Sequence, residues 1–148
     1  MFQREKLSVP AMRQVLGDTL RRLGVSEDSV ADILLAASEA CANVVLHAGQ
    51  SVRAYEVAAT VGRFGCRVEI RDSGLGCRVP RWRRRAARMA ESGRGFAVMR
   101  GCVDDVTLRS APGRGTSVVL RKRIDWNPPL PPVAAPALGS GRCSLVRG

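Results

Sequence analysis

The sequence predicts an α/β two-layer sandwich, in which a mostly antiparallel sheet carries helices on one of its faces. Two observations predict this class. Two long segments with apolar residues at helical spacing come first, and four strand-like segments follow in two pairs, each joined by a tight turn. Strands joined by tight turns run antiparallel, and helices with one apolar face cover a sheet from one side.

Two helices are expected in the N-terminal third of the chain. The first begins near Ser8, a candidate N-cap, has Pro10 in its first turn, and is stopped by Gly24. The second is capped by Ser26 and continues to about Ala48. The residues expected on the buried stripes are Leu16, Leu20 and Leu23 in the first helix and Val30, Ile33, Leu34 and Ala37 in the second.

The first strand pair is expected at residues 54–61 and 66–72, on either side of a Gly-Arg-Phe-Gly turn. Apolar and charged residues alternate along the second of these strands, and Asp72 falls on the apolar, core-facing side. A carboxylate on that side needs a partner, because burial of an unpaired charge is unfavourable.

The second half of the chain begins with a Gly- and Arg-rich segment over residues 73–95, which has room for a short helix. A helix at 96–103 then opens at Gly95, and strands at 105–110 and 116–124 are joined by a tight Ala-Pro-Gly-Arg-Gly turn. The rest of the chain is Pro-rich. One domain is therefore expected over residues 1–124, with a disordered tail over 125–148.

Composition limits the classes of protein that the chain can belong to. The chain has 148 residues, of which 45% are hydrophobic, so one folded domain is expected. No uninterrupted apolar run reaches the ~20 residues of a membrane span, and no apolar leader stands at the start. We therefore expect a cytoplasmic protein that makes no contact with a membrane.

The net charge is +11, nearly all of it from arginine, and a basic chain can bind nucleic acid, acidic proteins or phosphates. Two Trp, one Tyr and three Phe give no pattern of aromatics interleaved with basic residues, which argues against a nucleic-acid partner. The five cysteines form no Cys-x-x-Cys motif, so we expect reduced thiols rather than a zinc site: Cys41, Cys66, Cys77, Cys102 and Cys143.

A first polar motif interrupts the second helix. Glu39, Asn43 and His47 are each four residues apart, and steps of four advance about 40° around a helix, so the three side chains form one slanting stripe. A carboxylate and an amide one turn apart can share a hard cation, and a carboxylate can orient or deprotonate a nucleophile. The alternative is a polar stripe on a half-exposed helix, in which His47 only caps the helix end.

Three glycine motifs accompany this stripe. Asp72 is followed by Gly74 and Gly76, which let the backbone approach a flat ligand closely. The carboxylate can then accept a hydrogen bond from an amino group of that ligand. The alternative is an ordinary turn at the end of a strand. Gly93, Arg94 and Gly95 lead into a helix and can present N–H groups to phosphates, or form a flexible loop. The third motif, Gly-Arg-Gly-Thr at 113–116, places Thr116 near a buried site or forms a hairpin turn.

The four motifs, in this order and at this spacing, resemble the nucleotide-binding boxes of the GHKL ATPases, the superfamily of the histidine-kinase ATPase domains. The resemblance is closest to the bacterial anti-sigma-factor serine kinases of the RsbW type, and it covers about residues 8–124. It implies a Bergerat-type ATP-binding fold with ATP and Mg²⁺ as cofactors. The first strand of that fold must be short or missing here, because only seven residues precede Ser8.

The resemblance also implies roles for individual residues. Asn43 matches the Mg²⁺ ligand and Glu39 the catalytic base. The remaining matches bind the nucleotide: Asp72 and Thr116 at the adenine, Gly74 and Gly76 beside it, and Gly93, Arg94 and Gly95 at the phosphates. The segment between the first two glycine motifs departs from the family because it is strongly basic. We favour contact with a partner protein as the role of its six arginines: Arg78, Arg81, Arg83, Arg84, Arg85 and Arg88.

The function that the resemblance implies is that of an anti-sigma regulatory factor. Such a protein phosphorylates a serine or threonine of a STAS-type anti-anti-sigma partner and sequesters a sigma factor, and a homodimer is compatible with it. The alternative is a catalytically silent module that binds ATP or a sigma factor. A sensor histidine kinase is disfavoured, because the chain has no room for a phosphoacceptor helix pair.

Overall fold

A computed structural model describes residues 1–47, 52–74, 94–128 and 141–144. The elements in chain order are β1 (Phe2–Gln3), α1 (Ser8–Arg22), α2 (Glu27–His47), β2 (Ala54–Gly62), β3 (Gly65–Asp72), α4 (Arg94–Cys102), β4 (Asp105–Ser110), β5 (Thr116–Lys122) and β6 (Gly141–Ser144).

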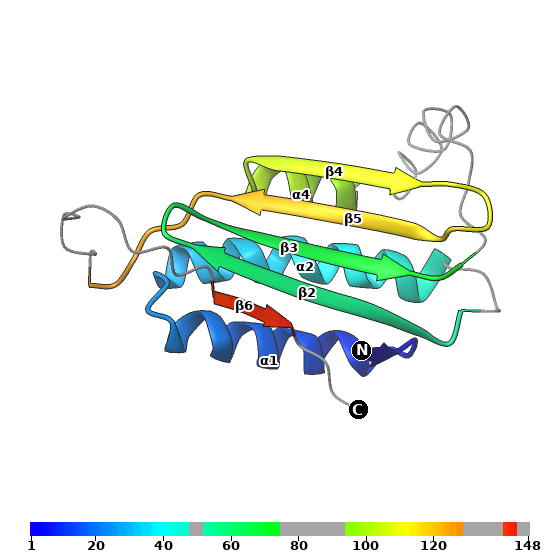
Figure 1. Cartoon of the computed structure of the whole chain (residues 1–148), viewed down its shortest axis with the longest axis horizontal. Coiled ribbons are helices and arrows are strands. Elements are labelled where there is room, and N and C mark those ends of the chain that lie inside the picture. The colour runs from blue at the N-terminus through cyan, green and yellow to red at the C-terminus, as the bar shows by residue number, and fades with distance from the viewer. Residues whose placement is uncertain (48–51, 75–93, 129–140, 145–148) are drawn as a thin grey trace.

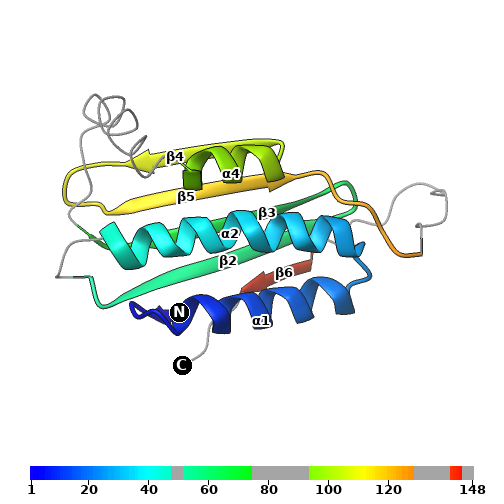
Figure 2. The same ribbon diagram turned by 180° about the vertical axis from the view of Figure 1, so that it is seen from behind.

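The strands form a single sheet in the order β1-β2-β3-β5-β4, and β6 pairs with β2. All of these pairings between described strands are antiparallel. Helices α1, α2 and α4 lie together on one face of the sheet, as the two opposite views in Figures 1 and 2 show. The predicted two-layer sandwich with a mostly antiparallel sheet is therefore confirmed. The first strand is short, as expected, and has two residues.

The core lies between the helices and the sheet, and α2 runs through its middle (Figure 2). The predicted stripe of α2 is buried from Val30 to Ala37, and α1 adds Leu16 and Leu20, whereas Leu23 is exposed because it lies at the C-cap, after the last turn of α1. By length and composition alone, α2 could cross a bilayer over Glu27–Leu46. Half of its most apolar window is buried inside the structure, as in the central helix of a globular domain.

The helix ends differ in part from the sequence predictions. Ser26 caps α2 as expected, since its Oγ accepts the N–H of Ser29 at 3.3 Å. Gly24 has a φ of 83° and follows the end of α1. The prediction that Ser8 is the N-cap of α1 is wrong, because Leu7 holds that position. Ser8 is buried inside the first turn, where its hydroxyl lies 2.8 Å from that of Tyr55.

Two parts of the predicted tail are ordered against the domain. Trp126 forms a β-bridge with Val25, and the N–H of Asn127 donates to the carbonyl of Gly24 at 2.7 Å. Further along, β6 pairs with β2. The expectation of disorder therefore does not hold for these residues, because backbone hydrogen bonds fix them without the apolar pattern that the sequence analysis required.

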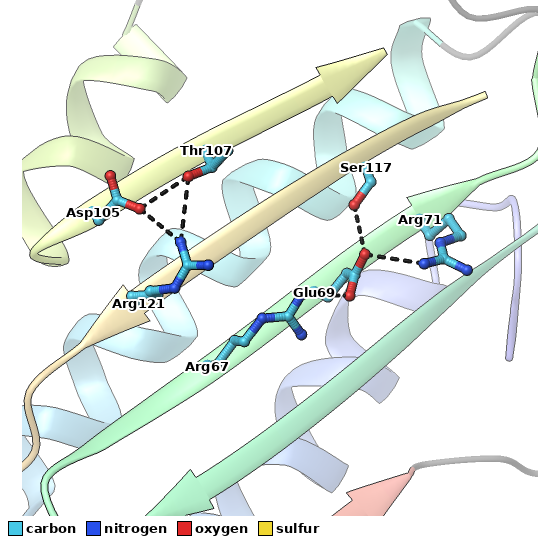
Figure 3. Close-up of polar contacts among 7 residues, drawn as sticks. All are labelled: Arg67, Glu69, Arg71, Asp105, Thr107, Ser117 and Arg121. Atoms are coloured by element: carbon cyan, nitrogen blue, oxygen red, sulfur yellow. Dashed lines mark hydrogen bonds and ion pairs between the residues drawn. The ribbon is translucent and has the colours of Figure 1, made fainter. Parts of the chain in front are cut away.

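The face of the sheet opposite α1, α2 and α4 holds a polar cluster centred on Glu69 (Figure 3). The Glu69 carboxylate accepts hydrogen bonds from Arg67 at 2.7 Å, from Ser117 at 2.7 Å and from Arg71 at 3.2 Å. Partial burial raises the pKa of Glu69, but the bonds from Arg67 and Ser117 and the arginine charges outweigh it and lower the pKa to about 2.

We expect Glu69→Gln to lower the free energy of unfolding by about 1 kcal/mol at neutral pH, because both ion pairs and part of the hydrogen bonding are lost on a partly exposed face. The folded pKa lies below the ordinary value of 4.5. The stabilisation is therefore complete above that value and is lost as the pH falls from about 4.5 towards about 2. Urea unfolding of both proteins across this pH range measures it.

Asp105→Asn is the matched control, because Asp105 pairs with Arg121 on the same face but is more exposed (Figure 3). It should change the free energy of unfolding by less than about 0.5 kcal/mol. An equal effect of both substitutions at neutral pH, or a difference between wild type and Glu69→Gln that persists at pH 2, would contradict the assignment.

Candidate functional site

Two glycine-containing clusters form the candidate site, and the first joins α2 to α4. A Cβ placed on Gly95 would lie 2.7 Å from Oε2 of Glu39 and 3.9 Å from Oδ1 of Asn43. Glycine at this position therefore lets the Glu39 carboxylate lie against the first turn of α4, and a side chain there would displace that carboxylate. The same approach brings a carboxylate oxygen and an amide oxygen, both half-buried, to one point beside the helix start.

The N-terminus of α4 adds backbone donors to this cluster. The described helix runs from Arg94, one residue before Gly95, at which the sequence predicts that the helix opens. Its first turn carries no acidic side chain of its own, and the nearby carboxylate is that of Glu39 on α2. Of the third member of the polar stripe, His47, only the backbone is described, at the last residue of α2.

The second cluster lies at the end of β3, around Asp72. This carboxyl is 6% exposed and faces the helices, as the alternation predicted. Its Oδ1 accepts the N–H of Gly74 at 2.8 Å. A Cβ on Gly74 would lie 2.8 Å from the same oxygen and 2.9 Å from Cγ2 of Val52, so a larger residue would displace the carboxylate or the wall beside it.

The start of β5 completes this cluster. Thr116 lies directly opposite Asp72 in the β3–β5 ladder. Gly115, just before it, has a φ of 72°, and a Cβ there would lie only 1.9 Å from the carbonyl oxygen of Asp72. On the other side of Thr116, the hydroxyl of Ser110 in β4 lies 3.1 Å from the Thr116 hydroxyl. Asp72, Thr116 and Ser110 therefore form one row across three strands.

The second cluster lies at one end of the interface between helices and sheet, towards which α2 of the first cluster runs. In Figure 1 the arrowhead of β3, the start of β5 and the C-terminal end of α2 lie together at the right. The two clusters together contain described residues of the four sequence motifs, and their convergence on one nucleotide stays a prediction. Gly76, Gly93 and the Arg-rich segment 78–88 lie outside the described residues.

Sequence reasoning missed three residues of the site. Gly115 belongs to the Gly-Arg-Gly-Thr motif, but its contact with Asp72 arises only from the pairing of β3 with β5. Ser110 and Val52 carry no local signal, because their roles arise only from strands and loops that are distant in sequence. The positive φ of Gly115 was detectable in principle, since a glycine before a strand often marks such a turn.

The chemistry open to the site follows from its oxygen atoms. The oxygens of Glu39 and Asn43 are hard ligands suited to Mg²⁺ with further oxygens from a substrate. Within the described ranges, no group of three His, Cys, Asp or Glu residues could hold a metal ion by itself. The buried thiols of Cys41 and Cys66 have pKa values raised to about 12 by burial, so neither offers a thiolate nucleophile.

Comparisons with known proteins identify the family of the domain. The profile of the histidine kinase-like ATPase domain family matches residues 2–122. The chain is 28% identical over 120 residues to an anti-sigma F factor of Halalkalibacterium halodurans, covering 76% of this chain and 82% of that protein. It is 29% identical over 133 residues to the serine-protein kinase RsbW of Bacillus licheniformis, covering 79% and 82%.

Two solved structures share the fold. One contains the RsbU and RsbW domains of a Mycobacterium tuberculosis protein, with a TM-score of 0.62, 22% identity, and coverage of 83% of this chain and 30% of that one. The other is a histidine kinase domain from a blue-light activated kinase of Erythrobacter litoralis, with a TM-score of 0.50, 23% identity, and coverage of 64% and 44%. This chain therefore spans less than half of either solved chain, and these likenesses concern the fold alone.

The contact of Gly115 with Asp72 gives a prediction with a matched control. Gly113 and Gly115 both have positive φ, but a Cβ on Gly113 would meet nothing within 4 Å. We expect Gly113→Ala to cost about 1 kcal/mol of unfolding free energy, from backbone strain alone. Gly115→Ala should cost about 2 kcal/mol more, because β3 and β5 must separate. Chemical unfolding measures both, and equal losses would contradict the packing described here.

Proposed function

Because the chain belongs to the histidine kinase-like ATPase domain family, we propose that it is an ATP-dependent anti-sigma regulatory factor. It would phosphorylate a serine or threonine of a STAS-type anti-anti-sigma protein and would otherwise hold a sigma factor inactive. Similarity to proteins named anti-sigma F factor and serine-protein kinase RsbW supports this reading. The observation that carries it is the approach of Gly95 to Glu39 and Asn43, which joins a helix N-terminus to two oxygen ligands.

In this proposal the second cluster binds adenine. The buried Asp72 accepts a hydrogen bond from the exocyclic amino group of the base, and burial excludes water that would compete for it. Thr116, opposite Asp72 in the ladder, positions a hydroxyl beside the same group. Gly74 keeps the carboxylate in place through its N–H, and it leaves room that a side chain would fill.

The first cluster holds the phosphates. The free N–H groups of the first turn of α4 and the guanidinium of Arg94 attract the negative charge of the phosphate chain. Asn43 would hold Mg²⁺ through its Oδ1. When bound, Mg²⁺ neutralises charge that develops on the transferred phosphoryl group.

Glu39 is the proposed base. Its Oε2 lies beside Gly95, next to the expected position of the γ-phosphate. A serine or threonine hydroxyl of the partner gives its proton to Glu39 while its oxygen forms a bond to the γ-phosphorus. The bond from that phosphorus to the bridging oxygen breaks, and ADP leaves. Positioning by α2 and α4 supplies much of the rate in such a reaction.

Nucleotide binding tests the pocket directly. We expect Asp72→Asn to lower the affinity for ATP by at least about tenfold, with or without Mg²⁺, because a charge-assisted hydrogen bond to the adenine amino group is lost. In the absence of Mg²⁺, Asn43→Ala should instead bind ATP with the same affinity as the wild type. Addition of Mg²⁺ should raise the affinity of this variant only slightly. Isothermal titration calorimetry measures both. Wild-type binding by Asp72→Asn would contradict the adenine site.

Phosphoryl transfer tests the base. Incubation with labelled ATP and a STAS partner should give a phosphorylated partner, and Glu39→Gln should slow transfer by about 100-fold or more with ATP affinity within a few fold. Transfer at the wild-type rate would remove Glu39 from this role. ATP binding without any transfer by the wild type would favour the silent binding module instead.

A further inference from the structure

The outer edge of β2 is closed by two short strands that come from opposite ends of the chain. One edge of β2 pairs with β3 from Tyr55 to Gly62. The other edge pairs with β1 at Ala54 and Tyr55, and with β6 over Ala58–Val61 (Figure 1). Because β1 has only two residues, β2 would have an unpaired edge from residue 56 onward if β6 were absent.

That edge has the properties of a strand acceptor. β2 has nine residues, and alternate side chains, those of Val57, Ala59 and Val61, are buried in the core, which fixes the strand in an extended form. Its one ionisable side chain beyond Tyr55 is that of Glu56. Natural sheets protect edges with charges, prolines or bulges, and residues 57–62 contain neither a charged side chain nor a proline.

We propose that the β2 edge is a strand-accepting interaction surface, which β6 of the same chain occupies and which β2 of a second copy fills when β6 is displaced. Every strand pairing around β2 is antiparallel, and two β2 strands can pair antiparallel about a two-fold axis. The edge is thus complementary to itself. This inference does not depend on the proposed ATP chemistry.

The start of the tail explains why the chain's own strand occupies the edge. Trp126 donates its indole N–H to the carbonyl of Arg63 at 2.8 Å, next to Gly62 at the end of β2. Gly141 pairs with Val61, one residue earlier in β2. The tail therefore leaves the domain beside the position where β6 binds. A tethered segment has an effective concentration of about millimolar, which exceeds that of a second copy in dilute solution.

The test breaks the backbone ladder of β6 and leaves the domain intact. The double variant Arg142→Pro with Cys143→Pro removes two adjacent N–H donors, and Arg142→Ala with Cys143→Ala is the matched control that keeps them. We expect those amides of Ala58–Val61 that point to β6 to exchange hydrogen about tenfold faster or more in the proline variant at low concentration. The alanine variant should exchange as the wild type does.

Analytical ultracentrifugation then tests whether β2 of a second copy pairs with the edge that β6 has left. The mass of the proline variant should rise with concentration towards twice that of the alanine variant, and a peptide of residues 139–147, added in excess, should reverse the rise. Unchanged exchange in the proline variant would show that β6 does not cover the edge. Faster exchange with equal masses at all concentrations would overturn the self-pairing, and a rise that the peptide leaves unchanged would place the contact elsewhere.

Discussion

The missing side chain at position 95 is the constraint on which the candidate site depends. A Cβ there would lie 2.7 Å from the Glu39 carboxylate, so α4 can rest on α2 in this position only as long as the residue is glycine or Glu39 moves. A similar condition holds at Gly115, whose backbone lies against that of Asp72. Glycines therefore shape both halves of the site: Gly95 leaves room for the Glu39 carboxylate, and Gly115 lets the backbone of β5 meet that of β3.

The two faces of the sheet carry different kinds of side chain. The helix-covered face buries the apolar core, and Asp72 is the one carboxylate that is buried in the part of the chain that the structure describes. It is held by the Gly74 N–H, so it keeps a hydrogen-bonding partner while facing the helices. The open face places its charged side chains in pairs, as around Glu69, where solvent limits what each pair contributes (Figure 3). A carboxylate retained on the core side is the kind of exception that marks a functional site.

Much of this arrangement could be predicted from the sequence, because side-chain periodicity encodes it. The apolar spacing of α2 and the alternation of β3 placed these elements within a residue or two, and the same alternation placed Asp72 on the buried face. The short strand β6 could not be predicted, and a short β1 was expected only from the family resemblance, because edge pairing uses backbone groups that every residue carries and needs no apolar pattern. Ser8 was misread as a cap because a serine at a helix start can also be bound from the sheet, here by Tyr55. The contacts of Gly95 and Gly115 with distant residues likewise arise only in the folded chain.

The most direct test of the central claim is a crystal structure of the chain with Mg²⁺ and an ATP analogue that cannot transfer its γ-phosphate. The account predicts the adenine amino group within hydrogen-bonding distance of Asp72, the phosphates at the first turn of α4, and Mg²⁺ bound to Oδ1 of Asn43. A nucleotide bound at another surface, or one that reaches Asp72 but leaves Asn43 and Gly95 untouched, would contradict the claim that the two clusters form one site.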